Sequence, residues 1–238
     1  MKQILCFVVI FHVILLSCGN IAAQIKSLEV VYELEEKPFW SGGAEAKERE
    51  EAILLVNMKN QNKALYALAF GNGHYRFQTM KSSTAIMRLD DGTTITESAV
   101  LVDEYIDFNT SVRYSLSEII DKAFIVKTSL EDCNWELTEE EAMIEGKLCH
   151  KAYLKKNERE TVTAWFTTAI PAPVGPAGYY GLSGLILRLE TREGVYTAVN
   201  IEYTNKEVDM TLPKDIEQVS EEEFRALEKK MFKEWGMK

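Results

Sequence analysis

The stretch Gly184–Lys206, GLILRLETREGVYTAVNIEYTNK, decides the fold class of this 238-residue chain. Its first half places three leucines on one side and two charged residues on the other: Leu185, Leu187 and Leu189 against Arg188 and Glu190. Such alternation is typical of a strand with one buried face. After a turn signal at residues 192–194, we expect the inward face to continue through Val195, Val199, Ile201 and Tyr203. The stretch therefore predicts an antiparallel hairpin.

The same alternation recurs along most of the chain. Short turn signals rich in Asn, Asp and Gly separate many of the segments, as antiparallel hairpins require. Candidate strands lie near 27–34, 51–58, 63–70, 74–80, 99–108, 111–116, 122–128, 148–155, 161–167, 184–192 and 195–206. The segment Ser41–Glu51 is predicted to be a surface loop or a frayed helical turn. The sequence thus predicts a mainly β fold, a curved antiparallel sheet of about ten strands arranged as a half-barrel or sandwich.

One amphipathic helix is expected at the C-terminus, over about 220–235. Ser220 and Glu223 have the spacing of a capping box, and acidic residues follow the helix start. One stripe of the helix carries Phe224, Leu227, Met231 and Trp235. A stripe of this kind favours packing on the protein's own sheet over binding a partner.

The first 23 residues have the pattern of a secretory signal. Lys2 precedes an apolar stretch, Ile4–Leu16, and small residues end at Ala23. The stretch is too short to span a bilayer comfortably, so no transmembrane span is expected in the mature chain, residues 24–238, which we expect to form one domain. An alternative is a lipobox, in which Cys18 is lipidated. Either way the protein is predicted to be exported, to the periplasm or to the outer membrane.

The chain is acidic, with a formal net charge of −10. A negative surface repels phosphate backbones, so nucleic-acid binding is not expected. Cys6 and Cys18 fall in the leader, which leaves Cys133 and Cys149 in an oxidising compartment. We predict a disulfide between them, with two buried thiols as the alternative.

An unusual segment precedes the hairpin: Ala164–Glu190, AWFTTAIPAPVGPAGYYGLSGLILRLE. It resembles the signature of the GLPGLI family of secreted bacterial proteins, and Ser183 stands where that family has a proline. The residues that carry this part of the resemblance are Trp165, Pro171, Pro176, Gly181, Leu182, Gly184, Leu185 and Ile186. An upstream motif also matches: Trp135, Ile144, Gly146, Cys149, Lys151 and Ala152. The resemblance implies export but no known activity, because that family has none established.

The prolines and glycines of this segment allow two interpretations. A stiff connection could cross an open end of the sheet as a structural element. Loops also carry function, so a functional surface is the alternative. Gly181 and Gly184 are the positions where a side chain would restrict positive φ or close backbone approach.

No residue pattern indicates catalysis or metal binding. Gly181–Gly184 lacks the spacing of a nucleophile elbow, and no pattern links His74 or His150 to Ser183. Cys149 and His150 are adjacent, so in a strand they point to opposite faces. The acidic runs are expected to be solvated. We therefore assign no catalytic residue, no metal site and no cofactor.

Aromatic residues are abundant, with 4 Trp, 10 Tyr and 10 Phe. Curved antiparallel sheets often enclose an apolar cleft. The sequence therefore favours a non-catalytic envelope protein that binds an apolar ligand, a lipid or an outer-membrane protein. The alternatives are an interaction protein that docks a membrane-protein partner through its Pro/Gly-rich segment, and an enzyme whose acids and histidines only the fold brings together.

Overall fold

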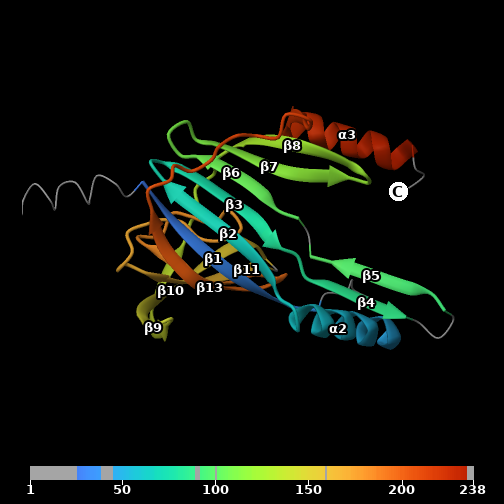
Figure 1. The fold of residues 1–238 in the computed structure, drawn as a ribbon, viewed down its shortest axis with the longest axis horizontal. Helices are drawn as coiled ribbons and strands as arrows, with labels where there is room; N and C mark the ends of the chain where they lie inside the picture. Colours follow the sequence, from blue (N-terminus) through green and yellow to red (C-terminus); the bar gives the residue numbers. More distant parts are fainter. Residues whose placement is uncertain (1–25, 39–44, 89–91, 100, 159, 235–238) are drawn as a thin grey trace, which may run out of the picture.

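The computed structural model describes residues 26–38, 45–88, 92–99, 101–158 and 160–234. The fold is mainly β, with 55% strand, and its large sheet does not close into a barrel (Figure 1). The predicted fold class is confirmed. The predicted leader with Cys18, and Trp235 of the C-terminal stripe, lie outside the described residues.

One sheet of twelve strands forms the body of the protein. All neighbouring strands are antiparallel except β14 and β8, which are parallel, so the sheet is mixed. Its order is β14 (Glu217–Ser220), β8 (Lys122–Ser129), β7 (Val112–Ile119), β6 (Asp103–Asp107), β3 (His74–Lys81), β2 (Ala64–Gly71), β1 (Ser27–Glu36), β13 (Gly194–Thr204), β12 (Leu185–Glu190), β11 (Glu160–Thr167), β10 (Lys147–Asn157) and β9 (Glu136–Ile144). A separate hairpin is formed by β4 (Thr84–Arg88) and β5 (Thr94–Ser98).

The predicted hairpin is present as β12 and β13, but the inward face of β13 differs from the prediction. Tyr196 and Ala198 are buried, whereas Val199 is 49% exposed. The cause is a β-bulge opposite β1, where Tyr32 pairs with Ala198 but the preceding residue, Val31, pairs with Asn200. The bulge skips one residue and exchanges the two faces of the strand. Ile201, beyond the bulge, packs against the core as expected, while Tyr203 is 57% exposed.

The predicted strand at 51–58 is wrong, because this segment lies within helix α2 (Ala46–Asn60). Glu45 and Glu48 form a reciprocal capping box at the helix start. The only part of the predicted loop 41–51 that the structure describes, residues 45–51, is the cap and the first turns of this helix. The buried face of α2 consists of Leu55, Val56 and Lys59.

Four strands were not predicted. The hairpin β4–β5 packs against α2, while β9 and β14 form the two edges of the large sheet. β9 has no fully buried residue, and three glutamates lie in its centre. Such strands lack the alternation on which the prediction depended.

The C-terminal helix α3 (Glu221–Glu234) agrees with the prediction. The backbone amide of Glu223 donates to the Ser220 hydroxyl at 3.2 Å, and the Glu223 carboxylate accepts from the Ser220 amide at 2.8 Å. Phe224, Leu227 and Met231 pack on a small buried cluster that includes Phe124. The helix therefore covers its own sheet at β8 (Figure 1).

The apolar residues form three clusters. The main core lies between β1–β3, β10–β13 and the connection from β11 to β12. A second cluster lies under α3, and a third joins α2 to the hairpin β4–β5 through Leu55, Ala85 and Met87. The α2 and β4–β5 elements therefore form a unit with a small core of its own, at one end of the molecule (Figure 1). In the described part of the chain, no helix is long and apolar enough to cross a membrane.

Candidate functional site

The residues Trp165–Ile186, which we call the hallmark segment, are folded into the protein. The connection between β11 and β12 turns inward, and Val174 pairs with Tyr180 in an isolated bridge. Its backbone then joins β12, because the Ile186 amide donates to the Val174 carbonyl at 3.0 Å. Pro176, Leu182 and Gly184 are buried, whereas Pro171 and Gly181 are exposed. Most of the segment therefore contributes to the core.

Two buried tyrosines hold the hallmark segment in place. The Tyr75 hydroxyl donates to the Gly175 carbonyl and accepts from the Gly178 amide, each at 3.0 Å. The Tyr32 hydroxyl donates to the Ile186 carbonyl at 2.6 Å. Burial raises the pKa of both tyrosines, so both hydroxyls stay protonated in the folded protein.

An ion pair with a buried carboxylate lies beneath Gly178. Arg113 of β7 donates to the carboxylate of Glu104 of β6, whose side chain is only 8% exposed. A β-carbon at Gly178 would lie 1.7 Å from Nη2 of Arg113, and its φ is +69°. Glycine is therefore required at this position both for space and for backbone conformation. Burial raises the pKa of Glu104, and Arg113 opposes that shift.

The upstream motif divides between the core and the outer face of the sheet. Cys149 and Ala152 are buried in the main core, and Trp135 and Ile144 pack against it. Trp135 also contacts the hallmark segment, because its indole nitrogen donates to the Tyr180 carbonyl at 2.8 Å. Gly146 forms the β9–β10 turn with φ +68°.

Lys151 and Trp165 lie opposite each other on neighbouring strands. The Lys151 ammonium lies 5.4 Å from the centre of the Trp165 ring and 2.9 Å from the Glu140 carboxylate. These two motif residues therefore form a surface contact that is separate from the core.

The predicted disulfide is not formed, since Cys133 and Cys149 are both free. Cys149 lies in β10, with its thiol directed to the Lys147 carbonyl at 3.6 Å. Cys133 precedes β9 and lies beside Gly181 of the hallmark segment. Burial raises the pKa of both thiols. The number of residues between the two cysteines does not show whether their β-carbons come close enough for a disulfide.

A polar cleft of about 680 Å³ adjoins the hallmark segment, and we call it the loop cleft. Its lining includes Arg113, Cys133, Lys156, Tyr179 and Tyr180. Several of these groups are already engaged within the protein: Lys156 lies 5.0 Å from the centre of the Tyr179 ring, and the Tyr180 hydroxyl donates to the Glu131 carbonyl at 2.5 Å. Part of the polar lining of the loop cleft is therefore already engaged in contacts within the protein.

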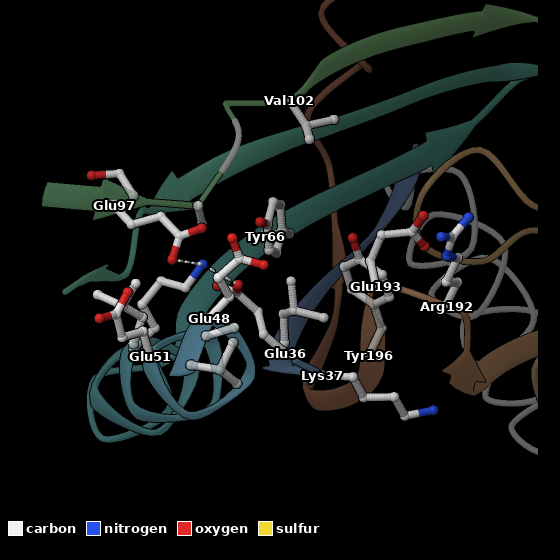
Figure 2. Close-up of a pocket in the computed structure, with 17 residues that line it drawn as sticks. Glu36, Lys37, Glu48, Glu51, Tyr66, Glu97, Val102, Arg192, Glu193 and Tyr196 are labelled. Atoms are coloured by element: carbon white, nitrogen blue, oxygen red, sulfur yellow. Dashed lines mark ion pairs between the residues drawn. The ribbon is translucent and has the colours of Figure 1, made fainter. Parts of the chain in front are cut away.

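A second cleft, of about 660 Å³, lies between α2, the hairpin β4–β5 and the large sheet, and we call it the α2 cleft. Its apolar lining consists of Leu34, Ala52, Leu55, Val56, Ala99 and Val102. Tyr66 and Tyr196 lie between its two ends, with ring centres 5.6 Å apart (Figure 2). Clefts of this size and composition are typical of sites for small apolar ligands.

Charged groups form the two ends of the α2 cleft (Figure 2). At one end the Lys59 ammonium lies 2.5 Å from the Glu36 carboxylate and 3.6 Å from that of Glu97. Glu36 also accepts a hydrogen bond from the Ser83 hydroxyl at 2.9 Å. The Lys59 side chain is only 6% exposed, so this network ties α2, β1 and the β4–β5 hairpin together in a site that water reaches poorly.

The tyrosines of the α2 cleft are uncharged. Burial, with Glu36 as a further cause, raises the pKa of Tyr66 to about 12. Burial also raises the pKa of Tyr196. Both rings are therefore neutral, and both are almost wholly buried in the wall of the cleft, with Tyr66 2% and Tyr196 7% exposed.

Sequence analysis predicted an apolar cleft in a curved sheet but did not locate it, because α2 was assigned as a strand. Ala52, Leu55, Val56 and Lys59 recur at helical spacing, and this was the signal available. Tyr66 and Tyr196 come from distant strands, and only the pairing of both β2 and β13 with β1 brings them together.

The two described histidines lie apart from both clefts. His74 is 3.8 Å from Asp107, and His150 is 3.3 Å from Glu141. Within the described residues, no three histidine, cysteine or acidic side chains gather as metal ligands.

Residues 119–188 match the model of a family described as "Protein of unknown function (Porph_ging)", an uncharacterised family found in Bacteroidetes. The matched range contains the whole upstream motif, the whole hallmark segment and the lining of the loop cleft except Arg113 and Glu221. It contains none of the residues that line the α2 cleft.

No curated protein is significantly similar to this chain in sequence. Among solved structures, the chain is similar to PNGF-II, with a TM-score of 0.54 and 12% identity over 86% of this chain and 33% of that one. An uncharacterised conserved protein from Thermus thermophilus matches with a TM-score of 0.42 and 9% identity, over 86% of this chain and 99% of that one. This chain thus spans about a third of the PNGF-II chain that it matches, and at these identities the likeness concerns the fold alone.

Proposed function

We propose that this protein is a non-catalytic binding protein of the cell envelope and that the α2 cleft holds an apolar ligand, such as a lipid. The observation that carries the proposal is the composition of the cleft: aliphatic side chains and two uncharged tyrosines between charged ends. Burial of a ligand's apolar surface there would contribute about 25 cal/mol for each Å² removed from water.

The position of the α2 cleft supports the same function. It lies at the junction of two separately packed units, the main core and the small α2–β4–β5 core. Ligand sites occur preferentially at such junctions, because two units can move apart to admit a ligand and close again.

A neutral fluorescent apolar dye, Nile red, tests the proposal directly. Ala52→Trp fills the cleft from α2, and we expect it to weaken dye binding at least about tenfold, since an indole takes space that a bound ligand needs. The matched control is Ile53→Trp, because Ile53 is the next residue of the same helix and is 41% exposed without lining the cleft. Native mass spectrometry of the purified protein should also detect a co-purified apolar molecule.

Two results would overturn the proposal. One is a protein that binds no dye, and the other is equal binding by both tryptophan variants. Circular dichroism and thermal melts of the two variants show whether a loss of binding reflects a loss of folding.

Export to the periplasm or outer membrane is part of this proposal, as is membership of the GLPGLI family. The support is the pattern of residues 1–23 and the ordered match from Trp135 to Leu187. The mass of the mature N-terminus distinguishes the two predicted routes: Gln24 as the first residue indicates ordinary cleavage, and a lipidated Cys18 indicates an anchored protein. A protein recovered from the cell envelope with Met1 still in place would contradict both processing routes.

A second proposed function is docking of an outer-membrane protein at the loop cleft. The observation that favours it is the family match, which covers this cleft and leaves out the α2 cleft. Ser183 is exposed and lies in the hallmark segment, so a photo-crosslinking residue at this position should capture the partner in cells. The same residue at exposed Glu139 of β9 is the control. Identical crosslinks from both positions would argue against the proposal.

A further inference from the structure

The carboxylates of the α2 cleft gather at one end. Glu48 and Glu51 are three residues apart on α2, which places them on one face of the helix. Glu97 of β5 approaches this end from the opposite wall, and Glu36 of β1 lies between them (Figure 2). Four carboxylates from three elements therefore converge on the same part of the cleft.

One cation stands against these four carboxylates among the described lining residues at this end. The ammonium of Lys59 is already matched by Glu36 at 2.5 Å, and Glu97 shares it at 3.6 Å. Glu51 has an additional partner in Lys47, but the distance is 3.8 Å and Lys47 is 83% exposed. Even with Lys47 counted, two cations stand against four carboxylates. The α2 end of the cleft therefore keeps an excess of negative charge.

The other cations of the cleft lie at the far end, beside the β12–β13 turn (Figure 2). Lys37 donates there to the Thr191 carbonyl at 3.3 Å, and Arg192 stands next to Glu193 in the sequence. Neither is close to the glutamates of α2 in this view. The apolar middle of the cleft thus separates a negative end from a mixed one.

The aromatic rings of the middle add no charge to the cleft. Tyr66 and Tyr196 are neutral, because burial raises the pKa of both, and one face of Tyr66 is already stacked on Phe77. The carboxylates therefore set the sign of the headgroup, because an anionic headgroup would meet them directly.

We infer that the ligand of the α2 cleft is an amphipathic cation, an apolar body that carries an ammonium group. The apolar body lies against Tyr66 and Tyr196, and the ammonium group lies among Glu48, Glu51 and Glu97. This inference rests on the proposed function, since it specifies the chemistry of the ligand in the same cleft.

Three probes of equal chain length separate the charge from the apolar contact: octylammonium, octanol and octanoate. We expect calorimetry at pH 7 and low salt to give octylammonium an affinity at least about tenfold higher than that of octanol, with octanoate the weakest. This preference should shrink as salt is added, because screening weakens contacts between partly exposed charges.

Glutamate-to-glutamine substitutions test whether the carboxylates of the α2 cleft cause the preference for octylammonium. Glu51→Gln and Glu97→Gln should each lower the affinity for octylammonium about threefold and leave that for octanol unchanged. Glu139→Gln, at an exposed position of β9, makes the same change in charge outside the cleft and should alter neither. Thermal melts confirm that each variant is folded, which matters for Glu51 because its side chain is only 29% exposed.

Each outcome has a distinct meaning. Equal binding of octylammonium and octanol, or tighter binding of octanoate, overturns the inference and leaves the proposed function in place. Failure of all three probes to bind overturns both. An octylammonium preference that survives both glutamine substitutions assigns the charge effect to another site and overturns the inference as well.

Discussion

The Tyr75 hydroxyl donates a hydrogen bond to the Gly175 carbonyl at 3.0 Å, across 100 residues of sequence. The same oxygen accepts from the Gly178 amide, so one side chain of β3 satisfies both backbone groups of the turn that Pro176 begins. Tyr75 is fully buried. The hallmark segment thus depends on a residue that lies outside it and outside the family match.

Replacing Tyr75 with phenylalanine should destabilise the protein strongly. The substitution keeps the ring but leaves a buried N–H and a buried C=O without a partner, at a cost of about 2–4 kcal/mol in the free energy of unfolding. Urea denaturation measures the change. Tyr203→Phe, at a position that is 57% exposed, is the control and should change stability by less than about 0.5 kcal/mol. Equal effects of the two substitutions would show that the hydrogen bonds at Tyr75 contribute nothing.

Gly178→Ala and Gly146→Ala together separate backbone strain from lack of space. The two glycines have nearly the same φ, +69° and +68°, but a β-carbon meets Arg113 and Glu104 at Gly178 and nothing within 4 Å at Gly146. We expect Gly146→Ala to cost about 1–2 kcal/mol through its left-handed backbone. Gly178→Ala should cost about 1–3 kcal/mol more, because the ion pair must move. Similar melting temperatures for the two variants would contradict this steric argument.

The strands that sequence analysis located share a clear alternation of apolar and polar residues, as in β1 and β12. Alternation fails to mark β9, where glutamates occupy both faces of an edge strand. It also gives no sign of the bulge beside Val199, because a bulge depends on how two strands pair and not on the residues of one. The existence of β1 and β12 was therefore predictable, and so was the facing of β12, but the facing of β13 was not predictable before its bulge.

Sequence analysis did not locate the α2 cleft, for a different reason. The apolar run Ile53–Val56 resembles a short buried strand, and it outweighed the helix-favouring residues Ala46–Ala52 that precede it. The resemblance to a known family drew attention to the hallmark segment, whose residues mostly pack in the core. The cleft itself is lined by residues between Leu34 and Tyr196, which come together only when β1 pairs with both of its neighbours.

The stability of the protein should depend on pH through Glu104. Burial raises the folded-state pKa of Glu104 above its unfolded value of 4.5, with Arg113 opposing the shift. The folded state therefore holds this proton more tightly than the unfolded state, so the group's contribution to stability falls as the pH rises through the folded pKa. Glu104→Gln, which cannot ionise, should become more stable relative to the unmodified protein between about pH 4 and pH 7.

Chemical denaturation at several pH values measures this difference. Glu118→Gln is the control, because Glu118 is exposed on the adjacent strand β7 and the substitution changes the net charge equally. A difference that grows in favour of the unmodified protein as the pH rises would show that attraction to Arg113 outweighs the burial of Glu104. Tyr75 does not complicate the measurement, since burial keeps its hydroxyl protonated in this range.

Lys59 should be the most sensitive position of the α2 cleft, because it holds three elements together. Lys59→Met removes the partner of Glu36, whose side chain is only 14% exposed, and should cost about 3–5 kcal/mol in the free energy of unfolding. Lys47→Met, which breaks an exposed pair with Glu51 on the same helix, should cost about 0.5 kcal/mol or less. The double variant Glu36→Gln with Lys59→Met should be more stable than Lys59→Met alone, because it no longer buries an unpaired charge. If urea denaturation gives Lys59→Met and Lys47→Met the same stability, the buried pair does not hold α2 against the sheet, and the cleft wall must depend on Leu55 and Val56 instead.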